Sequence, residues 1–285
     1  MRHCFAIIFG LVINSGIVAQ TPPIPFTDVF AFSVQSIDDF FDRFNARKNT
    51  AFTNYLSKNF TGYEIKRERL ILSLFDYNYL NSNHADASSM IMQVTDTSRP
   101  QFLRYDDNDW FAEVECKVYY KGIARTLEIV LKVEKSGYDT YHWAIVSAKA
   151  DFLNRKLVDL NNKSGQLAET DTTIGTKKYF LSPVSHGIDF VNLRNVFINK
   201  THVEDYIYKG QRSASLINFI SLVRSSQLKF QQANRILYKL VQIEGWIIEI
   251  NYFNRDSKNS GWLISKLTKV LPGEKNSYLK KYLEL

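Results

Sequence analysis

Cysteine is scarce in this chain: Cys4 and Cys116 are the two cysteines among 285 residues. A fold held together by several disulfides is therefore excluded, and the chain must rely on an apolar core. Cys116 falls at an inward position of a predicted strand, with no activating base near it in sequence. We therefore expect Cys116 to be a buried small hydrophobic residue rather than a nucleophile.

The sequence also lacks the motifs of the common catalytic and cofactor sites. There is no HExxH, CxxC, GxSxG, P-loop or GxGxxG pattern, and the five histidines are scattered, with no pair at i and i+4. We therefore predict no metal site, no cofactor and no hydrolase triad. No nucleic-acid-binding motif is present either, so nucleic acid is not an expected partner.

Long apolar runs are absent as well, because no stretch of 18 or more apolar residues occurs. The apolar run from Phe5 to Ile13 follows Arg2 and is too short to span a bilayer. Residues 1–20 resemble a secretory signal peptide that is cleaved near residue 20. The alternative is that this segment is retained as a membrane anchor.

The chain is rich in Asn, Lys, Tyr, Phe and Ile. With a signal ending in Ala19-Gln20, this composition resembles that of envelope proteins of AT-rich Gram-negative bacteria. The resemblance implies export to the periplasm or cell envelope.

Positive charge is concentrated in the last third of the chain. Residues 197–285 carry 14 Lys+Arg and 7 Asp+Glu, which accounts for the net charge of +7. Such a basic face is either simply solvated or contacts an acidic partner, such as a membrane surface or another polyanion.

The stretch from Trp110 to Ala150 predicts three antiparallel strands joined by two turns. Apolar and polar residues alternate there with the period of two that a strand requires, so that Val114 and Cys116 fall opposite Glu113. One apolar and one charged face indicate a sheet that is covered on one side.

Helices are predicted upstream of these strands. Ser36 is placed to cap a helix whose apolar residues recur at i, i+3, i+4 and i+7, namely Ile37, Phe40, Phe41 and Phe44. A second helix is predicted over residues 63–79, followed by a polar loop over 81–89 and a short strand over 90–95.

The second half of the chain repeats this order. We predict a short helix within residues 188–196 and a longer one over 213–234, capped by Ser213 or Ser215. Strands are predicted over residues 235–243, 246–253 and 262–270, with a terminal helix over 278–283.

The repeated order suggests a fold of class α+β with two tandem domains. Residues 1–20 form the signal peptide, 21–158 the first domain, 159–178 a polar linker and 179–285 a second, basic domain. Trp143 and Trp262 are then equivalent positions. The alternative is two unrelated α+β domains.

Helices followed by a curved antiparallel meander resemble the cone-fold superfamily named for a nuclear transport factor, which includes the SnoaL-like and ketosteroid-isomerase-like proteins. The matching parts are the Phe40–Phe44 helix against strands 110–147 and the Leu216–Val223 helix against strands 235–270. The resemblance implies two tandem cones, each with helices on the concave side of a bent sheet around an apolar pocket.

Three functions are compatible with these observations. The first is an exported, non-catalytic binding or scaffold protein whose partner is a small apolar ligand or an envelope protein. The second is an enzyme like the SnoaL or ketosteroid isomerase proteins, for which the candidate ligand-binding or catalytic residues are Tyr119, Tyr120, His142 and Asp151. His142 lies on the opposite strand face from Trp143, so we expect it to be solvated. The third is a module that binds polyanions or a membrane surface through the basic last third.

Overall fold

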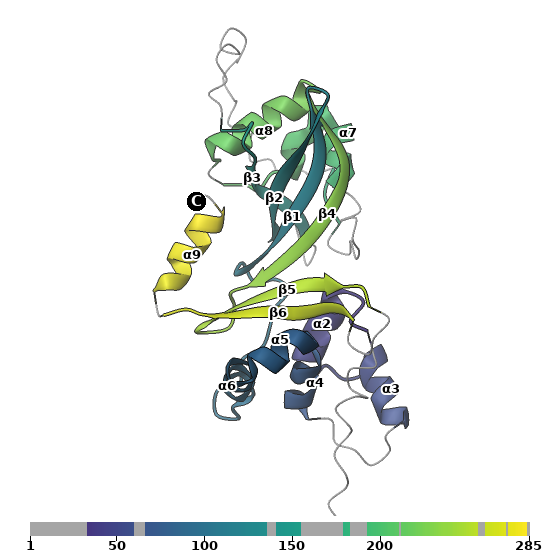
Figure 1. Cartoon of the computed structure of the whole chain (residues 1–285), viewed down its shortest axis with the longest axis vertical. Coiled ribbons are helices and arrows are strands. Elements are labelled where there is room, and N and C mark those ends of the chain that lie inside the picture. The colour runs from purple at the N-terminus through teal and green to yellow at the C-terminus, as the bar shows by residue number, and fades with distance from the viewer. Residues whose placement is uncertain are drawn as a thin grey trace, which may run out of the picture.

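A computed structural model of the chain describes residues 33–59, 66–135, 141–154, 179–182, 193–210, 212–255, 260–271 and 273–283. The predicted signal peptide and the predicted linker over residues 159–178 lie outside these ranges. The α+β class is confirmed, since helices accompany one curved, open, antiparallel sheet of six strands (Figure 1).

The helices of the first half precede the sheet. The residue bounds of the five helices are α2 (Ile37–Phe44), α3 (Ala51–Asn59), α4 (Arg67–Ser73), α5 (Tyr77–Ser82) and α6 (His84–Thr95). The predicted cap of α2 is confirmed, because the Ser36 hydroxyl accepts a hydrogen bond from the Asp39 amide at 3.1 Å.

The segment between residues 81 and 95 was predicted wrongly as a loop and a strand. It forms α6, whose buried residues recur at helical spacing: Ala87, Met90, Ile91 and Val94. The many polar residues between them face solvent, and they obscured this period of three and four.

Two three-stranded meanders make up the sheet. The first comprises β1 (Trp110–Tyr120), β2 (Ile123–Lys135) and β3 (Tyr141–Lys149). The second comprises β4 (Leu228–Leu240), β5 (Trp246–Phe253) and β6 (Gly261–Lys269). The predicted bounds of β5 are confirmed.

Between the meanders lie α7 (Leu193–Ile198), the 3-10 helix η1 (Lys200–Tyr206) and α8 (Ala214–Arg224), and α9 (Glu274–Leu283) follows β6. The helix predicted over residues 213–234 ends ten residues early, because Ser226 adopts a positive φ of 58° and the chain then enters β4. Ser213 caps α8, as one of the two predicted alternatives proposed.

The two meanders form one sheet rather than two. The strand order is β3-β2-β1-β4-β5-β6, so the central contact is an antiparallel pairing of β1 with β4, from Trp110 opposite Leu240 to Tyr120 opposite Leu228. β5 pairs with β4 over Leu237–Leu240 only, and β5 and β6 then run across the end of the other strands (Figure 1).

The helices contact both meanders, but their main partners differ from the predicted ones. α2 and α5 pack against β6, in the second meander, while α8 packs mainly against β3, in the first (Figure 1). The exchange follows from the joined sheet. The chain enters β1 at Trp110, which pairs with Leu240 at the end of β4, so the segment that precedes β1 lies beside the second meander. Each half of the chain therefore completes the core of the other half.

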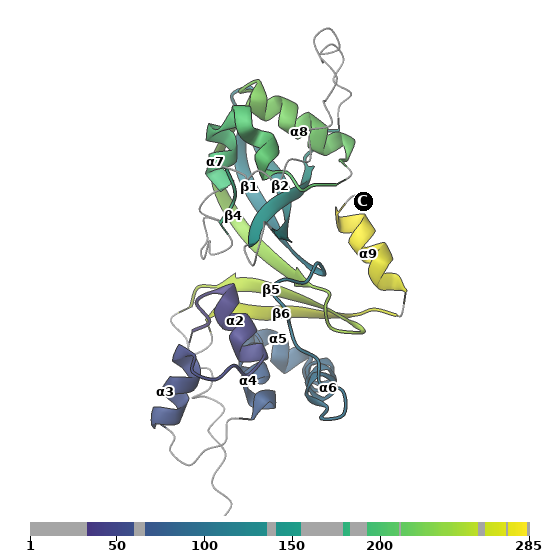
Figure 2. The same ribbon diagram turned by 180° about the vertical axis from the view of Figure 1, so that it is seen from behind.

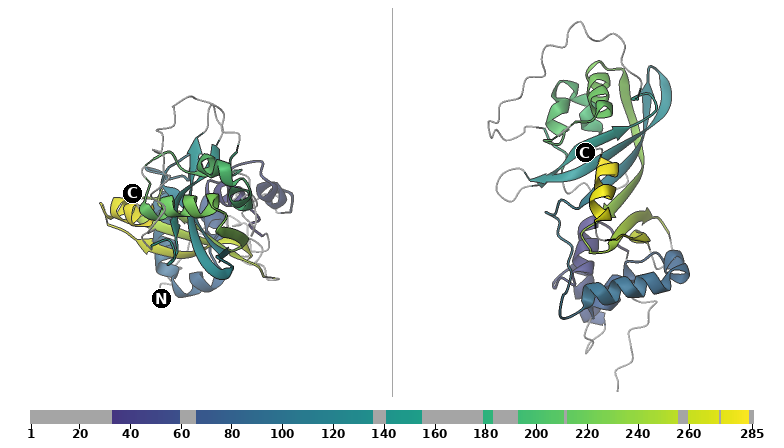
Figure 3. Two further views of the ribbon diagram at one scale, coloured as in Figure 1. Left: turned by 90° about the horizontal axis from the view of Figure 1, so that it is seen from above. Right: turned by 90° about the vertical axis from the view of Figure 1, so that its left-hand side faces the viewer.

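The sheet has helices on both faces. α2, α4, α6, α7 and α8 contribute to the large core on one face, whereas α9 packs on the opposite face over Phe111, Val130, Val146 and Ile247 (Figure 3). Both edge strands are partly covered, because Leu181 and Ile207 bridge to β3, and Val34 and Phe75 bridge to β6.

Candidate functional site: a basic groove between α7 and β4

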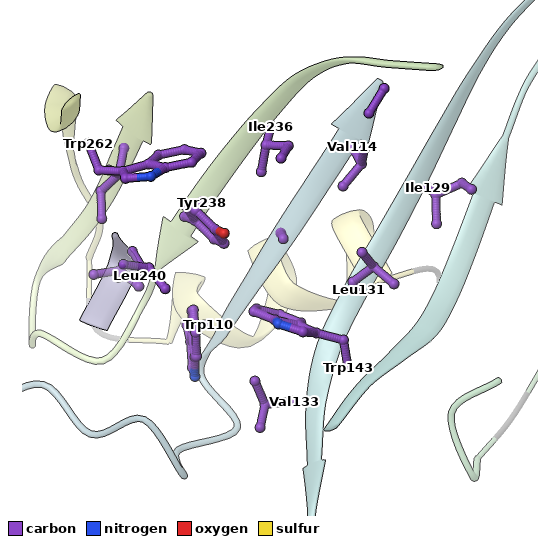
Figure 4. Close-up of a cluster of buried hydrophobic side chains, with 14 of the residues drawn as sticks. Trp110, Val114, Ile129, Leu131, Val133, Trp143, Ile236, Tyr238, Leu240 and Trp262 are labelled. Atoms are coloured by element: carbon purple, nitrogen blue, oxygen red, sulfur yellow. The ribbon is translucent and has the colours of Figure 1, made fainter. Parts of the chain in front are cut away.

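Aromatic side chains fill the concave side of the sheet where an open cone would have its pocket. Trp110, Trp143, Tyr238 and Trp262 lie side by side, each at most 2% exposed (Figure 4). The ring centroids of Trp110 and Trp143 are 4.9 Å apart, and those of Tyr238 and Trp262 are 4.8 Å apart. Burial raises the pKa of the Tyr238 phenol, which therefore stays protonated and belongs to the packed core.

The four candidate residues from the sequence do not converge on one site. His142 lies near the end of the sheet that holds Trp110, because Glu134 and His142 are paired across β2 and β3. Tyr119 and Tyr120 end β1, ten residues from Trp110, and Tyr119 is exposed on the face opposite the large core. Asp151 is exposed in the turn after β3.

Tyr120 and Asp151 belong to the same end of the sheet, although no contact joins them directly. The Tyr120 ring stacks on Phe152, next to Asp151, with 4.6 Å between centroids. This stacking closes the end of the core and explains the position of Tyr120 by packing alone.

The prediction that His142 is solvated is wrong. Its side chain is buried, and its Nε2 lies 3.0 Å from the Glu134 carboxylate. The same carboxylate accepts a hydrogen bond from the Lys209 amide at 3.0 Å. The segment Ile207–Lys209 bridges to Ile145 of β3 and reaches Glu134, the partner of His142, and the alternation within β3 alone could not reveal these contacts.

Cys116 is buried, as predicted. Burial raises the pKa of its thiol, so the thiolate that a nucleophile requires is disfavoured. The described residues hold no group of three or more His, Cys, Asp or Glu side chains that could ligate a metal. Within the same ranges, every helix falls short of the length and apolarity needed to cross a bilayer.

α7 lies against β4 (Figure 2), and a basic groove is formed between α7 and the first residues of β4. Its volume is ≈ 240 Å³, and its lining joins an apolar floor to a cationic rim. The floor contains Phe197 and Phe230, whose centroids are 5.2 Å apart, with Leu228 beside them. The rim contains Arg194, Lys200 and Lys229, all exposed to solvent.

Packing within the core fixes the walls of this groove. Phe197 also contacts Phe219 of α8, at 5.8 Å between centroids, so α7 is held against the core by the ring that forms the floor. On the opposite wall, Tyr119 of β1 pairs with Lys229 across the sheet, which fixes the position of that lysine backbone. The groove therefore rests on elements that the fold holds in place.

The rim cations have little negative charge around them. η1, which begins at Lys200, carries two acids: Glu204 is engaged by Arg224 at 2.8 Å and Arg212 at 3.8 Å, and the Asp205 carboxylate lies 3.6 Å from the His202 ring. No ion pair recorded among the described residues involves Arg194, Lys200 or Lys229; the Lys200 ammonium donates instead to the Ser226 hydroxyl at 2.6 Å. Arg194 and Lys200 beside an aromatic floor, with Lys229 at its edge, can bind an anion that carries an apolar group.

The groove residues were missed by sequence reasoning, although the charge distribution pointed to their region. The excess of Lys and Arg after residue 197 indicated a basic surface but could not select Lys200 and Lys229 from the other cations. Arg194 and Lys229 are brought together by the packing of α7 on β4, which no local pattern encodes.

Comparison with known proteins returned no match: no family model, no curated protein and no solved structure is similar to this chain.

Proposed function

We propose that this chain is a non-catalytic binding protein, exported to the envelope of a Gram-negative bacterium, that holds an acidic segment of a partner protein in the α7–β4 groove. The single observation that carries the proposal is the groove itself, with Arg194, Lys200 and Lys229 around a floor of Phe197 and Phe230. Export rests on the resemblance of residues 1–20 to a signal peptide.

The size of the groove supports a peptide-like ligand. A volume of ≈ 240 Å³ accommodates one or two side chains rather than a large cofactor. A carboxylate beside an aromatic or aliphatic residue matches both the rim and the floor. Exposed cations attract such a segment at long range, and this attraction weakens as salt concentration rises.

The organisation of the core favours binding over catalysis. Packed aromatic rings occupy the concave side of the sheet. The candidate residues for an isomerase-like reaction are also separated, because His142 lies at one end of the sheet and Tyr120 lies at the other. A general base must come within hydrogen-bond reach of the proton that it abstracts. The His142 imidazole instead faces Glu134 in a covered position.

We also propose that the bent sheet is a variant of the cone-fold superfamily, with one joined sheet in place of two tandem cones. The order of helices before each meander and the helices packed on the concave face support this relation. An experimental structure would test the joined sheet on which this proposal rests, because a strand order other than β3-β2-β1-β4-β5-β6 contradicts that sheet.

The peptide-binding proposal is tested with a fluorescent peptide that alternates glutamate and phenylalanine, by fluorescence anisotropy. Arg194→Glu/Lys229→Glu is expected to weaken binding by about tenfold or more, because two attractive charges become repulsive. Binding to the unaltered chain is expected to weaken steadily with added NaCl.

The matched control is Lys48→Glu/Lys66→Glu, which makes the same change of net charge at exposed positions in the helical region of the first half. This control is expected to bind the peptide like the unaltered chain. Equal losses in both variants, or binding of heparin without binding of the peptide, contradict the proposal and favour a nonspecific polyanion-binding surface.

A further inference from the structure

The helix α9 has the composition of a helix that lies on a membrane surface. Tyr278, Leu279, Tyr282 and Leu283 share the side that packs on the sheet, while Lys280 and Lys281 are exposed. At 100° per residue, the two lysines lie about 130° to either side of the centre of the apolar face. Basic side chains flanking an aromatic and aliphatic face are typical of interfacial helices.

The surface beneath α9 is unusually polar for a covered face. Glu113 and Lys239 form an ion pair of 3.0 Å there, with side chains 12% and 5% exposed. The Lys239 ammonium lies 3.8 Å from the centroid of the Tyr282 ring, so α9 itself covers the cation. On the same face, the buried Ser147 hydroxyl has no hydrogen-bond partner among the described residues.

This arrangement weakens the attachment of α9 to the sheet. Removing two charges from water carries a desolvation cost that their mutual attraction offsets only in part. Departure of α9 returns Glu113 and Lys239 to water and recovers that cost. A ten-residue helix is also marginal on its own, so it is stable only while an apolar surface covers its Tyr and Leu side chains.

Apart from this packing and the contacts of its tyrosine rings, two polar contacts recorded among the described residues tie α9 to the sheet and to the turn before it, and they lie near its two ends. Lys275 pairs with Asp109 at 2.5 Å, and Lys149 donates to the carbonyl of Tyr282 at 3.1 Å. Because α9 follows the edge strand β6 and pairs with no strand, it can leave the sheet without breaking the strand ladder.

We propose that α9 exchanges between the back face of the sheet and an anionic lipid surface. On the lipid surface Tyr278, Leu279, Tyr282 and Leu283 enter the headgroup region, and Lys280 and Lys281 contact anionic lipids. A bilayer replaces the apolar cover that the sheet provides, and its negative charge complements the lysines. This interaction is independent of the α7–β4 groove.

The first test is co-sedimentation of the whole chain with vesicles of phosphatidylglycerol and phosphatidylcholine, compared with vesicles of pure phosphatidylcholine. Binding to the anionic vesicles alone is expected. Lys280→Glu/Lys281→Glu is expected to reduce that binding by about tenfold or more. Neither lysine has a recorded ion pair among the described residues, but both lie in the last turn of α9, where a cation favours the helix; circular dichroism checks that the variant keeps its helices.

Two controls separate this proposal from the others. Lys48→Glu/Lys66→Glu, with the same change of net charge, and Arg194→Glu/Lys229→Glu, in the groove, are both expected to bind anionic vesicles like the unaltered chain. Vesicle binding that survives Lys280→Glu/Lys281→Glu, or that is lost equally in all three variants, overturns the role of α9.

The second test asks whether α9 itself enters the lipid. Tyr282→Trp places an indole on the apolar face of α9, whereas Trp110, Trp143, Trp246 and Trp262 are buried in the fold. Brominated phosphatidylglycerol is expected to quench the fluorescence of Tyr282→Trp and to leave the unaltered chain nearly unquenched. If Tyr282→Trp binds the vesicles but its fluorescence is not quenched, the proposal is overturned.

Discussion

The ion pair of Lys239 and Glu113 shows that the effect of a buried charge on the stability of this fold depends on whether its partner is present. The two side chains face each other across β4 and β1 with little access to water. Burial raises the pKa of the Glu113 carboxyl, and the nearby Lys239 ammonium opposes that shift. A buried charge that loses its partner is much more costly than a pair replaced by apolar side chains.

Lys239→Met alone is therefore expected to lower the free energy of unfolding by about 3–5 kcal/mol at neutral pH. Glu113→Leu/Lys239→Met is expected to lie within about 1 kcal/mol of the unaltered chain or above it. Urea unfolding followed by circular dichroism measures both. A double variant less stable than the single variant contradicts this explanation.

The pH dependence of Lys239→Met follows from the same carboxyl. With the ammonium gone, the folded-state pKa of Glu113 rises further above its unfolded value, so the folded state binds the proton more tightly. Protonation of Glu113 therefore relieves the defect in Lys239→Met. The stability of this variant relative to the unaltered chain is highest at pH values below the unfolded-state pKa of Glu113, and it is lost as pH rises through the folded-state pKa. The loss in unfolding free energy should accordingly be smaller at acidic than at neutral pH.

At the scale of elements, α2 illustrates what local sequence determines. Its cap, its acidic first turn and its apolar stripe all lie within Ser36–Phe44, and all were predictable because each depends on neighbours in sequence. Phe41 then contacts Trp110, with 5.1 Å between ring centroids, and this contact depends on the rest of the fold.

Ser36→Ala is expected to destabilise the whole chain by about 1 kcal/mol, because the Asp39 amide loses the acceptor that caps α2. Ser57→Ala is a suitable control, since its hydroxyl bonds within exposed α3 and caps no helix. Thermal unfolding measures both changes. Equal stability of Ser36→Ala and the unaltered chain contradicts the importance of this cap.

At the scale of the whole molecule, the exchange of helices between meanders predicts that the two halves of the chain fold together. The first half expressed as residues 21–158 leaves β1 without β4 and leaves α2 and α5 without β6. We expect this fragment to bind a hydrophobic dye and to lack a cooperative unfolding transition. Co-expression with residues 179–285 is expected to restore that transition.

A fragment 21–158 that unfolds cooperatively as a monomer contradicts this prediction. That outcome supports instead a division of the chain into two self-sufficient domains. The apolar face of β1–β3, covered by α8 in the complete chain, is the surface whose exposure the dye reports.

Sequence patterns predicted most of the elements but not their partners. Alternation located β5 over Trp246–Phe253, and helical spacing located α2, because both signals lie within one element. The pairing of β1 with β4 joins residues more than a hundred positions apart, and nothing local distinguishes it from pairing within each half. The groove depends on that same arrangement, so its region was indicated by charge while its residues were not.

The exchange of helices also has a consequence for how the chain is synthesised. The residues of α2 leave the ribosome about 220 residues before those of β6, which corresponds to roughly 10–40 s at about 5–20 residues per second. During that interval the phenylalanines of α2 lack their final partner. We therefore expect the nascent chain to expose part of the apolar face of α2, and to be prone to aggregation, until its last strand has been made.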